Sequence, residues 1–150
     1  LVDEKAAEMM KKELFPLAEV LTPNIPEAEV LTGKKIQTRE EMEQAAEQLS
    51  REYGTAIVLK GGHAKTDAND LLYENGKSIW IEGERMVNPN THGTGCTLSS
   101  AITSHIALGY DVVEAVRLSK IYITEAIRHS FDIGHGVGPV NHFYKFEKVD

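Results

Sequence analysis

A turn with two glycines lies in the stretch Asn90-Thr91-His92-Gly93-Thr94-Gly95-Cys96-Thr97-Leu98-Ser99-Ser100-Ala101-Ile102. The residues that follow the turn recur at helical spacing and predict a helix that begins at Thr94 or Gly95. They are Leu98, Ala101, Ile102, His105 and Ile106. Backbone N–H groups in the first turn of a helix lack intrahelical partners and lie at the positive end of its dipole. We therefore expect an anion site here, with phosphate as the usual occupant.

The only cysteine of the chain, Cys96, falls in the first turn of this predicted helix. The thiolate form of a cysteine is favoured at a helix N-terminus, so Cys96 is a candidate base. A simpler structural explanation is a glycine bend in which a buried cysteine packs as a small hydrophobic residue. The local sequence does not separate these two interpretations.

The composition describes an ordinary globular protein with enough residues to bury a core. The chain has 150 residues, of which 41% are hydrophobic and 26% charged. A formal net charge of −7 argues against non-specific binding of nucleic acid or of an anionic membrane. The single cysteine excludes an internal disulfide and is typical of a reducing, cytoplasmic setting. Because the sequence starts Leu1-Val2-Asp3, we expect it to begin inside a longer protein.

Helical and strand-like segments alternate along the chain, which predicts an α/β fold with a largely parallel sheet. Residues 3–16 read as a helix with Ala6, Met9, Met10 and Leu14 on one face, and residues 19–22 as a short strand. The apolar run at 55–60 is typical of a central strand covered on both faces. Asn75-Gly76 predicts a hairpin between 70–74 and 77–81. Helices are expected at 38–53, from the Thr38 capping box to Gly54, and at 111–130, capped by Asp111 with Glu114. A short helix closed by Gly33 is expected before them.

Polar residues follow two of the predicted strands. Asn24 and Glu27 come after the first strand, where an amide and a carboxylate suit a hydrated divalent ion, although they also suit a helix cap. Lys60 ends the buried strand, where its ammonium could pair with a phosphate or simply reach water. Ligands bind at the carboxyl ends of strands in open α/β sheets, so these residues and the glycine turn are expected at one edge.

Histidine chemistry is a weaker interpretation of this sequence. The six histidines are His63, His92, His105, His129, His135 and His142. None belongs to an HxxxH pair with a supporting carboxylate, so we expect no histidine metal site and keep His63 and His92 as pocket candidates. A serine hydrolase is also disfavoured, because the sequence contains no nucleophile elbow.

Four motifs occur in order along the chain: TPNIPEAEVLTG at 22–33, VLKGGH at 58–63, NTHGTGC at 90–96 and GVGPVNH at 136–142. Together they resemble the hydroxymethylpyrimidine/phosphomethylpyrimidine kinases, the thiamine-pathway branch of the ribokinase-like superfamily. The resemblance implies a three-layer αβα fold with a largely parallel sheet. It also implies that residues 1–150 are the C-terminal, nucleotide-binding part of a single kinase domain, without the N-terminal part that contacts the substrate.

The resemblance implies ATP and Mg²⁺ as cofactors and assigns roles to individual positions. Cys96 is the expected base, and Gly93, Thr94 and Gly95 would donate backbone N–H groups to the γ-phosphate. Lys60, Thr91 and Lys120 would contact the nucleotide, Lys120 near the adenine. Asn24 and Glu27 would hold magnesium and its waters.

Three functions remain open at this point. The first is ATP-dependent phosphorylation of 4-amino-5-hydroxymethyl-2-methylpyrimidine and of its monophosphate in thiamine biosynthesis. The second is a pyridoxal or pyridoxine kinase, since relatives with the same glycine motif phosphorylate such alcohols. The third is an inactive nucleotide-binding fragment. The resemblance further implies a homodimer of the full-length protein, a small-molecule pyrimidine substrate, and no nucleic-acid or membrane partner.

Overall fold

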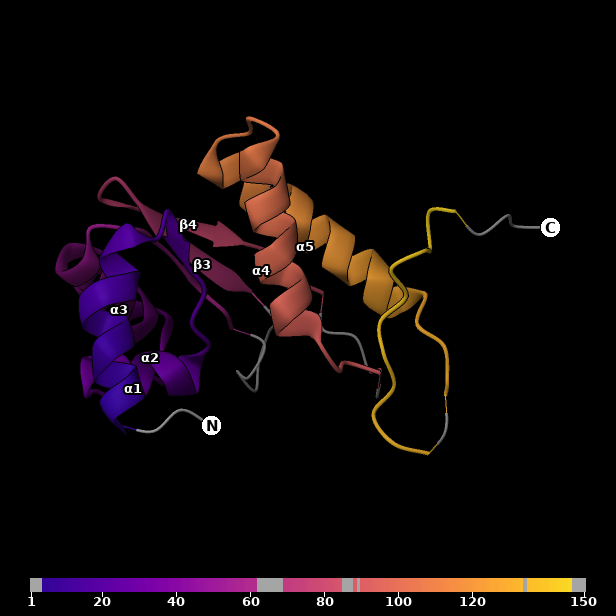
Figure 1. The fold of residues 1–150 in the computed structure, drawn as a ribbon, viewed down its shortest axis with the longest axis horizontal. Coiled ribbons are helices and arrows are strands. Elements are labelled where there is room, and N and C mark those ends of the chain that lie inside the picture. The colour runs from indigo at the N-terminus through magenta and orange to yellow at the C-terminus, as the bar shows by residue number, and fades with distance from the viewer. Residues whose placement is uncertain (1–3, 62–68, 85–87, 89, 134, 147–150) are drawn as a thin grey trace. The chain divides into compact units, whose positions relative to one another are not determined.

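The computed structural model describes residues 4–61, 69–84, 88, 90–133 and 135–146. Figure 1 shows helices and strands of a mixed α/β fold. The chain divides into two compact units, Leu1–Glu82 and Gly83–Asp150. Among the helices that this part of the chain forms, none has both the length and the apolar character needed to span a membrane.

The first unit contains a four-stranded sheet in the order β1 (Val20–Leu21), β2 (Ala56–Leu59), β3 (Asp70–Glu74), β4 (Lys77–Ile81). β1 and β2 pair in parallel, whereas β3 is antiparallel to both β2 and β4. The hairpin between β3 and β4 is confirmed, and Asn75 and Gly76 have the positive φ angles of 50° and 76° that its two-residue turn requires.

The expectation of a largely parallel sheet is wrong for these four strands. Only residues 60–69 lie between β2 and β3, and a parallel pair needs a crossover connection of about a dozen residues or more. The two-residue turn likewise leaves β3 and β4 no arrangement other than antiparallel. The α/β class itself is confirmed.

The core of the first unit lies between the sheet and helix α3 (Arg39–Tyr53). Ile57, Leu59 and Leu71 belong to the same buried cluster as Leu49 of α3. Val58 alternates with its neighbours along β2 and is also fully buried, as predicted for a central strand covered on both faces. Helix α2 (Ile25–Thr32) packs beside α3.

The helix-end signals in the sequence are confirmed. Thr38 and Glu41 form a capping box at the start of α3, and Asp111 accepts a hydrogen bond from the Glu114 backbone at the start of α5 (Val112–Arg128). Gly33 and Gly54 end α2 and α3 with φ angles of 69° and 70°, in the left-handed region that glycine adopts without strain.

The first predicted helix differs from expectation. It breaks into α1 (Glu4–Met9), a π-helix (Met10–Leu14) and a 3₁₀-helix (Phe15–Leu17). Met9, Met10 and Leu14 of the expected apolar face are exposed, and the π turn breaks the 3.6-residue period on which that face depends. Phe15 instead packs edge-on against Tyr53, with ring centroids 5.2 Å apart.

The second unit is built on a helical hairpin. Helices α4 (Thr94–Ala107) and α5 pack side by side (Figure 1), and Gly109, with φ of 95°, lies in the turn between them. Nδ1 of His105 lies 3.0 Å from Oγ of Ser119, which is fully buried on α5. This polar contact joins the two helices.

Candidate functional site

Three of the predicted site residues meet at the carboxyl ends of β1 and β2. Asn24 and Lys60 form a parallel β-bridge, and the Lys60 N–H donates to the Pro23 carbonyl at 2.9 Å. Glu27 lies in the first turn of α2, which Asn24 caps. The structure therefore confirms that the two polar loops after these strands share one sheet edge.

Asn24 and Glu27 hold each other in a capping box. Oδ1 of Asn24 accepts from the Glu27 N–H at 2.8 Å, and Oε2 of Glu27 accepts from the Asn24 N–H at 2.8 Å. The helix-cap interpretation of this pair is thus confirmed. The cap occupies one carboxylate oxygen of the exposed Glu27, and the other carboxylate oxygen forms no hydrogen bond with any described residue.

The backbone at Gly61, directly after Lys60, is held by a buried carboxylate. Oδ1 of Asp70 accepts a hydrogen bond from the Gly61 N–H at 2.9 Å, and Asp70 is only 3% exposed. A Cβ atom at position 61 would lie 1.9 Å from the Asn69 carbonyl oxygen, so only glycine fits. The hydrogen bond from Gly61 to Asp70 holds the backbone at the position that follows Lys60 in the sequence.

The second unit contains the glycine turn. Gly93 is the N-cap of α4, with φ of 82°, and no side chain caps the helix. The Thr94 N–H donates weakly to the Thr91 carbonyl at 3.3 Å, and the Thr97 N–H donates to the Gly93 carbonyl at 2.9 Å. Within the described residues, the N–H groups of Gly93, Gly95 and Cys96 have no hydrogen-bond partner. These backbone donors are therefore available at the start of α4.

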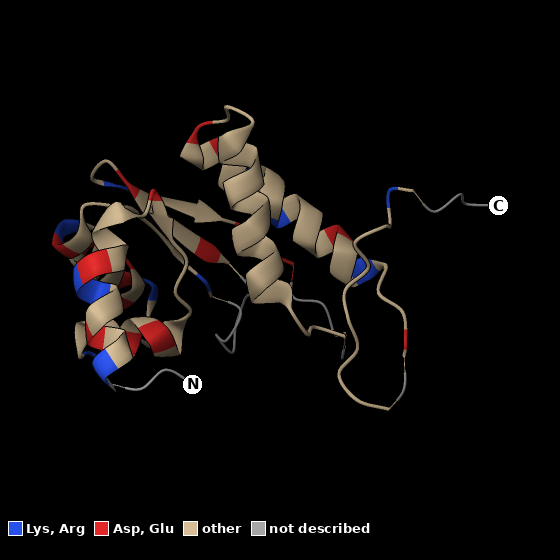
Figure 2. Cartoon of the chain, in the orientation of Figure 1, with Lys and Arg blue, Asp and Glu red and all other residues tan. Residues whose placement is uncertain are grey.

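The charge distribution distinguishes the start of α4 from the other long helices. Figure 2 shows α4 without a charged side chain along its length, whereas α2, α3 and α5 carry glutamates in their first turns. A carboxylate in the first turn offsets the positive end of the helix dipole and competes with an anionic ligand. The first turn of α4 is free of that competition.

Cys96 is the third residue of α4, and its side chain is exposed. The alternative of a buried cysteine that packs as a small hydrophobic residue is therefore wrong. An exposed thiol beside these unpaired backbone donors is accessible to a small molecule bound at the turn.

Thr91 and Lys120, the other predicted nucleotide contacts of this unit, differ in exposure and in position along the helical hairpin. Thr91 is exposed and directly precedes the turn. Lys120 is half-buried on α5 and follows Ser119, which contacts His105. Since α4 rises by about 1.5 Å per residue, His105 lies about 13 Å along its axis from Cys96, and Lys120 lies near the level of His105.

One of the two histidines expected as pocket residues is described by the structure. His92 is exposed, with its backbone N–H donating to the Gly138 carbonyl at 3.3 Å, and His63 lies outside the described residues. No group of three or more His, Cys, Asp or Glu side chains arranged to hold a metal occurs in the described ranges.

A contact that sequence reasoning missed joins Asn90 to Gly138. Both residues belong to motifs of the family resemblance, at 90–96 and 136–142, but the sequence predicts no role for either. A hydrogen bond between residues 48 positions apart leaves no periodic signal in the sequence. The Asn90 side chain accepts from the Gly138 N–H at 2.8 Å. The segment around Gly138 is therefore bound to the glycine turn rather than loose.

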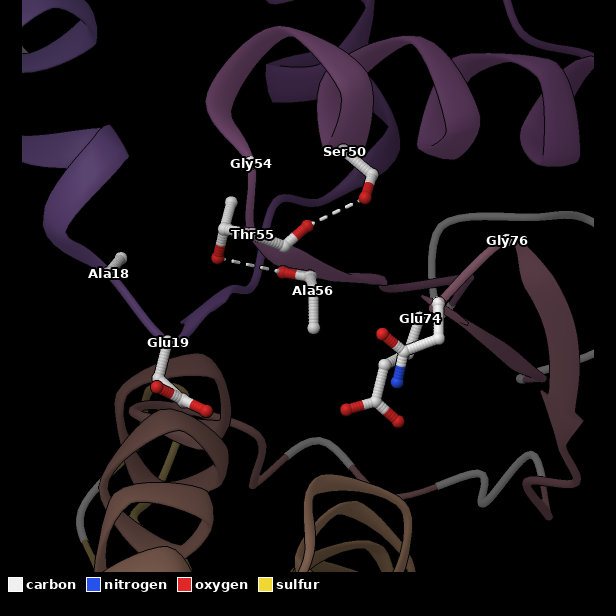
Figure 3. Close-up of a pocket in the computed structure, with 9 residues that line it drawn as sticks. Ala18, Glu19, Ser50, Gly54, Thr55, Ala56, Glu74 and Gly76 are labelled. Atoms are coloured by element: carbon white, nitrogen blue, oxygen red, sulfur yellow. Dashed lines mark hydrogen bonds between the residues drawn. The ribbon is translucent and has the colours of Figure 1, made fainter.

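A pocket of about 330 Å³ lies elsewhere in the first unit, at the amino ends of β1 and β2. Figure 3 shows Glu19, Glu74 and Ser50 among its lining residues. The Ser50 hydroxyl donates to the Thr55 carbonyl at 2.8 Å. None of the predicted site residues lines this pocket. Its two carboxylates would repel a phosphate, so it does not suit a nucleotide.

Known proteins resemble this chain along almost its entire length. The family model described as phosphomethylpyrimidine kinase matches residues 1–141. A hydroxymethylpyrimidine/phosphomethylpyrimidine kinase from Haemophilus influenzae is 39% identical over 95% of this chain and 55% of its own length. The chain thus spans about half the length of such curated relatives.

Solved structures of two kinds share the fold. The crystal structure of phosphomethylpyrimidine kinase from Clostridium difficile is 43% identical, with a TM-score of 0.71 over 85% of this chain and 51% of that one. An ADP complex of Bacillus subtilis pyridoxal kinase is 36% identical, with a TM-score of 0.88 over 96% and 55%. Both belong to the ribokinase-like fold.

Proposed function

Because this chain belongs to the phosphomethylpyrimidine kinase family, we propose that it supplies the phosphate-binding and proton-accepting part of an ATP-dependent kinase. The proposed acceptors are 4-amino-5-hydroxymethyl-2-methylpyrimidine and its monophosphate, and the second transfer produces the diphosphate. The relatives' names support this substrate class.

The observation that carries the proposal is the first turn of α4. The free N–H groups of Gly95 and Cys96, with no acidic side chain nearby in the turn, suit the negative charge that develops on a transferring γ-phosphate. Phosphoryl transfer asks a protein mainly for positioning and charge stabilisation. Of the three expected donors, Gly93 and Gly95 have N–H groups without a partner among the described residues, whereas the Thr94 N–H is engaged by the Thr91 carbonyl.

Cys96 is proposed as the group that accepts the proton of the substrate hydroxymethyl group, or that assists the second transfer. Its thiol is exposed in the same turn as these backbone donors. Proton transfer is late in a loose transition state, so a base of moderate strength is sufficient. The acceptor oxygen loses its proton to Sγ of the Cys96 thiolate as its bond to the γ-phosphorus forms. The bond between that phosphorus and the β–γ bridging oxygen of ATP breaks in the same step, and ADP leaves.

Lys60, Thr91 and Lys120 are proposed to contact ATP. Lys60 is held by its bridge to Asn24 and offers a positive charge to the phosphates. Thr91 lies next to the glycine turn, and Lys120 lies about 13 Å further along the helical hairpin. A nucleotide that lies along α4, with its triphosphate at the turn, would have its base near Lys120.

Asn24 and Glu27 fit a hydrated magnesium ion. The second carboxylate oxygen of Glu27 and the exposed setting suit an ion that keeps most of its waters, because Mg²⁺ takes only one or two protein oxygens. When bound, the ion would neutralise part of the charge on the ATP phosphates. The capping box keeps Glu27 in place for this role.

A pyridoxal kinase is the second candidate, favoured by the likeness to the Bacillus subtilis enzyme. Steady-state phosphorylation of the pyrimidine alcohol, its monophosphate and pyridoxal by the full-length protein tests the two. We expect kcat/KM to be highest for the pyrimidine compounds. A higher value for pyridoxal would reverse the assignment, and ATP binding without turnover of any alcohol would favour an inactive nucleotide-binding protein.

A further inference from the structure

The Asn90 side chain ties together segments far apart in the sequence. It is 5% exposed, and its Oδ1 accepts from the Gly138 N–H at 2.8 Å. Its Nδ2 donates to the Asp132 carboxylate at 2.7 Å. A Cβ atom at position 138 would lie 2.3 Å from Oδ1 of Asn90, so the fit depends on glycine.

The contacts of Asn90 with Gly138 and Asp132 form a junction, and backbone contacts on both sides of Asn90 extend it. The His92 N–H donates to the Gly138 carbonyl at 3.3 Å, and His92 and Pro139 form a parallel β-bridge. On the other side, Asn88 accepts from the Asn90 N–H at 2.8 Å. Nδ2 of Asn88 donates to the Ile127 carbonyl at 2.9 Å, which ties this segment to the end of α5.

The chemistry of the junction requires an amide at position 90. The Gly138 N–H can only donate and the Asp132 carboxylate accepts, so the side chain between them must accept on one side and donate on the other. Aspartate at position 90 would keep the acceptor, lose the donor and face the Asp132 carboxylate. Like charges at hydrogen-bond distance repel, and the buried contact would open.

The junction ends immediately before the glycine turn. Gly93, the N-cap of α4, follows His92 directly, so the position of the free Gly95 and Cys96 N–H groups depends on the segment that Asn90 holds. We propose that Asn90 is a positioning residue, which with Gly138 and Asp132 fixes the glycine turn for phosphoryl transfer. This inference rests on the proposed kinase function, and Asn90 acts through the turn rather than on the substrate.

Three variants of the full-length protein test the proposal: Asn90→Asp, Asp132→Asn and the double variant with both substitutions. In the double variant, the carboxylate at position 90 accepts from the Gly138 N–H and from the new amide at position 132, so the junction is restored. We expect Asn90→Asp to lower kcat about tenfold or more while KM for ATP changes little, because displacement of reacting groups mainly affects turnover. The double variant should recover most of the lost kcat. Asn75→Asp in the exposed hairpin turn is the matched control.

Amide hydrogen exchange gives a readout that does not depend on the substrate. The His92, Gly138 and Thr97 N–H groups are hydrogen-bonded in the junction or in the first turn of α4. The hydrogen exchange of these groups should accelerate in Asn90→Asp and slow again in the double variant. Unchanged hydrogen-exchange rates in Asn90→Asp would show that Asn90 does not hold the junction. If these rates change but the wild-type protein phosphorylates no alcohol, only the kinase function is refuted. Restored exchange without restored kcat would also overturn the positioning role.

Discussion

Asn24 and Lys60 pair as neighbours across the ends of two parallel strands, although they lie far apart in the sequence. Asn24 also caps α2 through the Glu27 backbone, so a single residue links the strand end, the helix start and the lysine. The pairing gives the ammonium-bearing residue a defined place at the sheet edge. This edge is where an α/β sheet binds its ligands.

Removing the charge of Lys60 should weaken ATP use. In Lys60→Met we expect kcat/KM for ATP to fall by about tenfold or more, since one charge-assisted contact to a phosphate contributes about 1.5–3 kcal/mol. Initial-rate assays of the full-length protein measure this. Lys77→Met makes the same change on the exposed start of β4 and should leave kcat/KM unaltered. Equal effects in the two variants would contradict the role of Lys60.

Replacing Cys96 should affect turnover more than binding. We expect Cys96→Ala to reduce kcat by about 10²–10⁴-fold, the range that a positioned base contributes. The affinity for ATP should stay close to that of the wild type, because the backbone donors remain. Rapid-quench kinetics and calorimetric titration with an ATP analogue provide the two measurements. Near-normal kcat in Cys96→Ala would remove the thiol from the mechanism.

The close approach at Gly61 should make its substitution costly. In Gly61→Ala the new methyl group meets the Asn69 carbonyl, and we expect a loss of about 1–3 kcal/mol in the free energy of unfolding. Urea denaturation measures it. Gly136→Ala is the matched control, because a Cβ atom there meets nothing within 4 Å and its φ is not positive. Comparable losses in both variants would show that the crowding at Gly61 is relieved cheaply.

The buried Tyr53 should make stability sensitive to alkaline pH. Burial, with a further contribution from the nearby Glu52 carboxylate, raises the pKa of the Tyr53 hydroxyl above its ordinary value of 10.0. Above that pH the unfolded chain releases the proton while the folded protein retains it, so stability falls as pH rises. The difference in unfolding free energy between the wild type and Tyr53→Phe, measured from pH 8 to 11, should therefore shift in favour of the variant.

The neutral-pH result for Tyr53→Phe provides a second check. Among the described residues, the Tyr53 hydroxyl is buried without a hydrogen-bond partner, and such a group costs stability. The variant should be at least as stable as the wild type at pH 7, since its ring can still pack against Phe15. A clear loss of stability at pH 7 would reveal a hydrogen bond that the hydroxyl makes in solution.

Local features of the fold could be predicted from the sequence because nearby residues produce them. The caps at Thr38 and Asp111, the glycine end of α3 and the Asn75-Gly76 turn all depend on groups within a few residues of each other. The start of α4 at Thr94 belongs to the same class. The interrupted first helix was missed because its exposed apolar residues still have helical spacing in the sequence.

The sequence by itself determined the caps of α3 and α5, the start of α4, the hairpin, the order of the four motifs and hence the family. Only the tertiary structure decided that β2 and β3 are neighbours in the sheet, that Asn24 pairs with Lys60, and that Asn90 binds Gly138. These contacts join residues that are distant along the chain, and the last two are single pairings without a repeating pattern. Their partners are selected by how the strands and helices pack, which no local stretch of sequence contains.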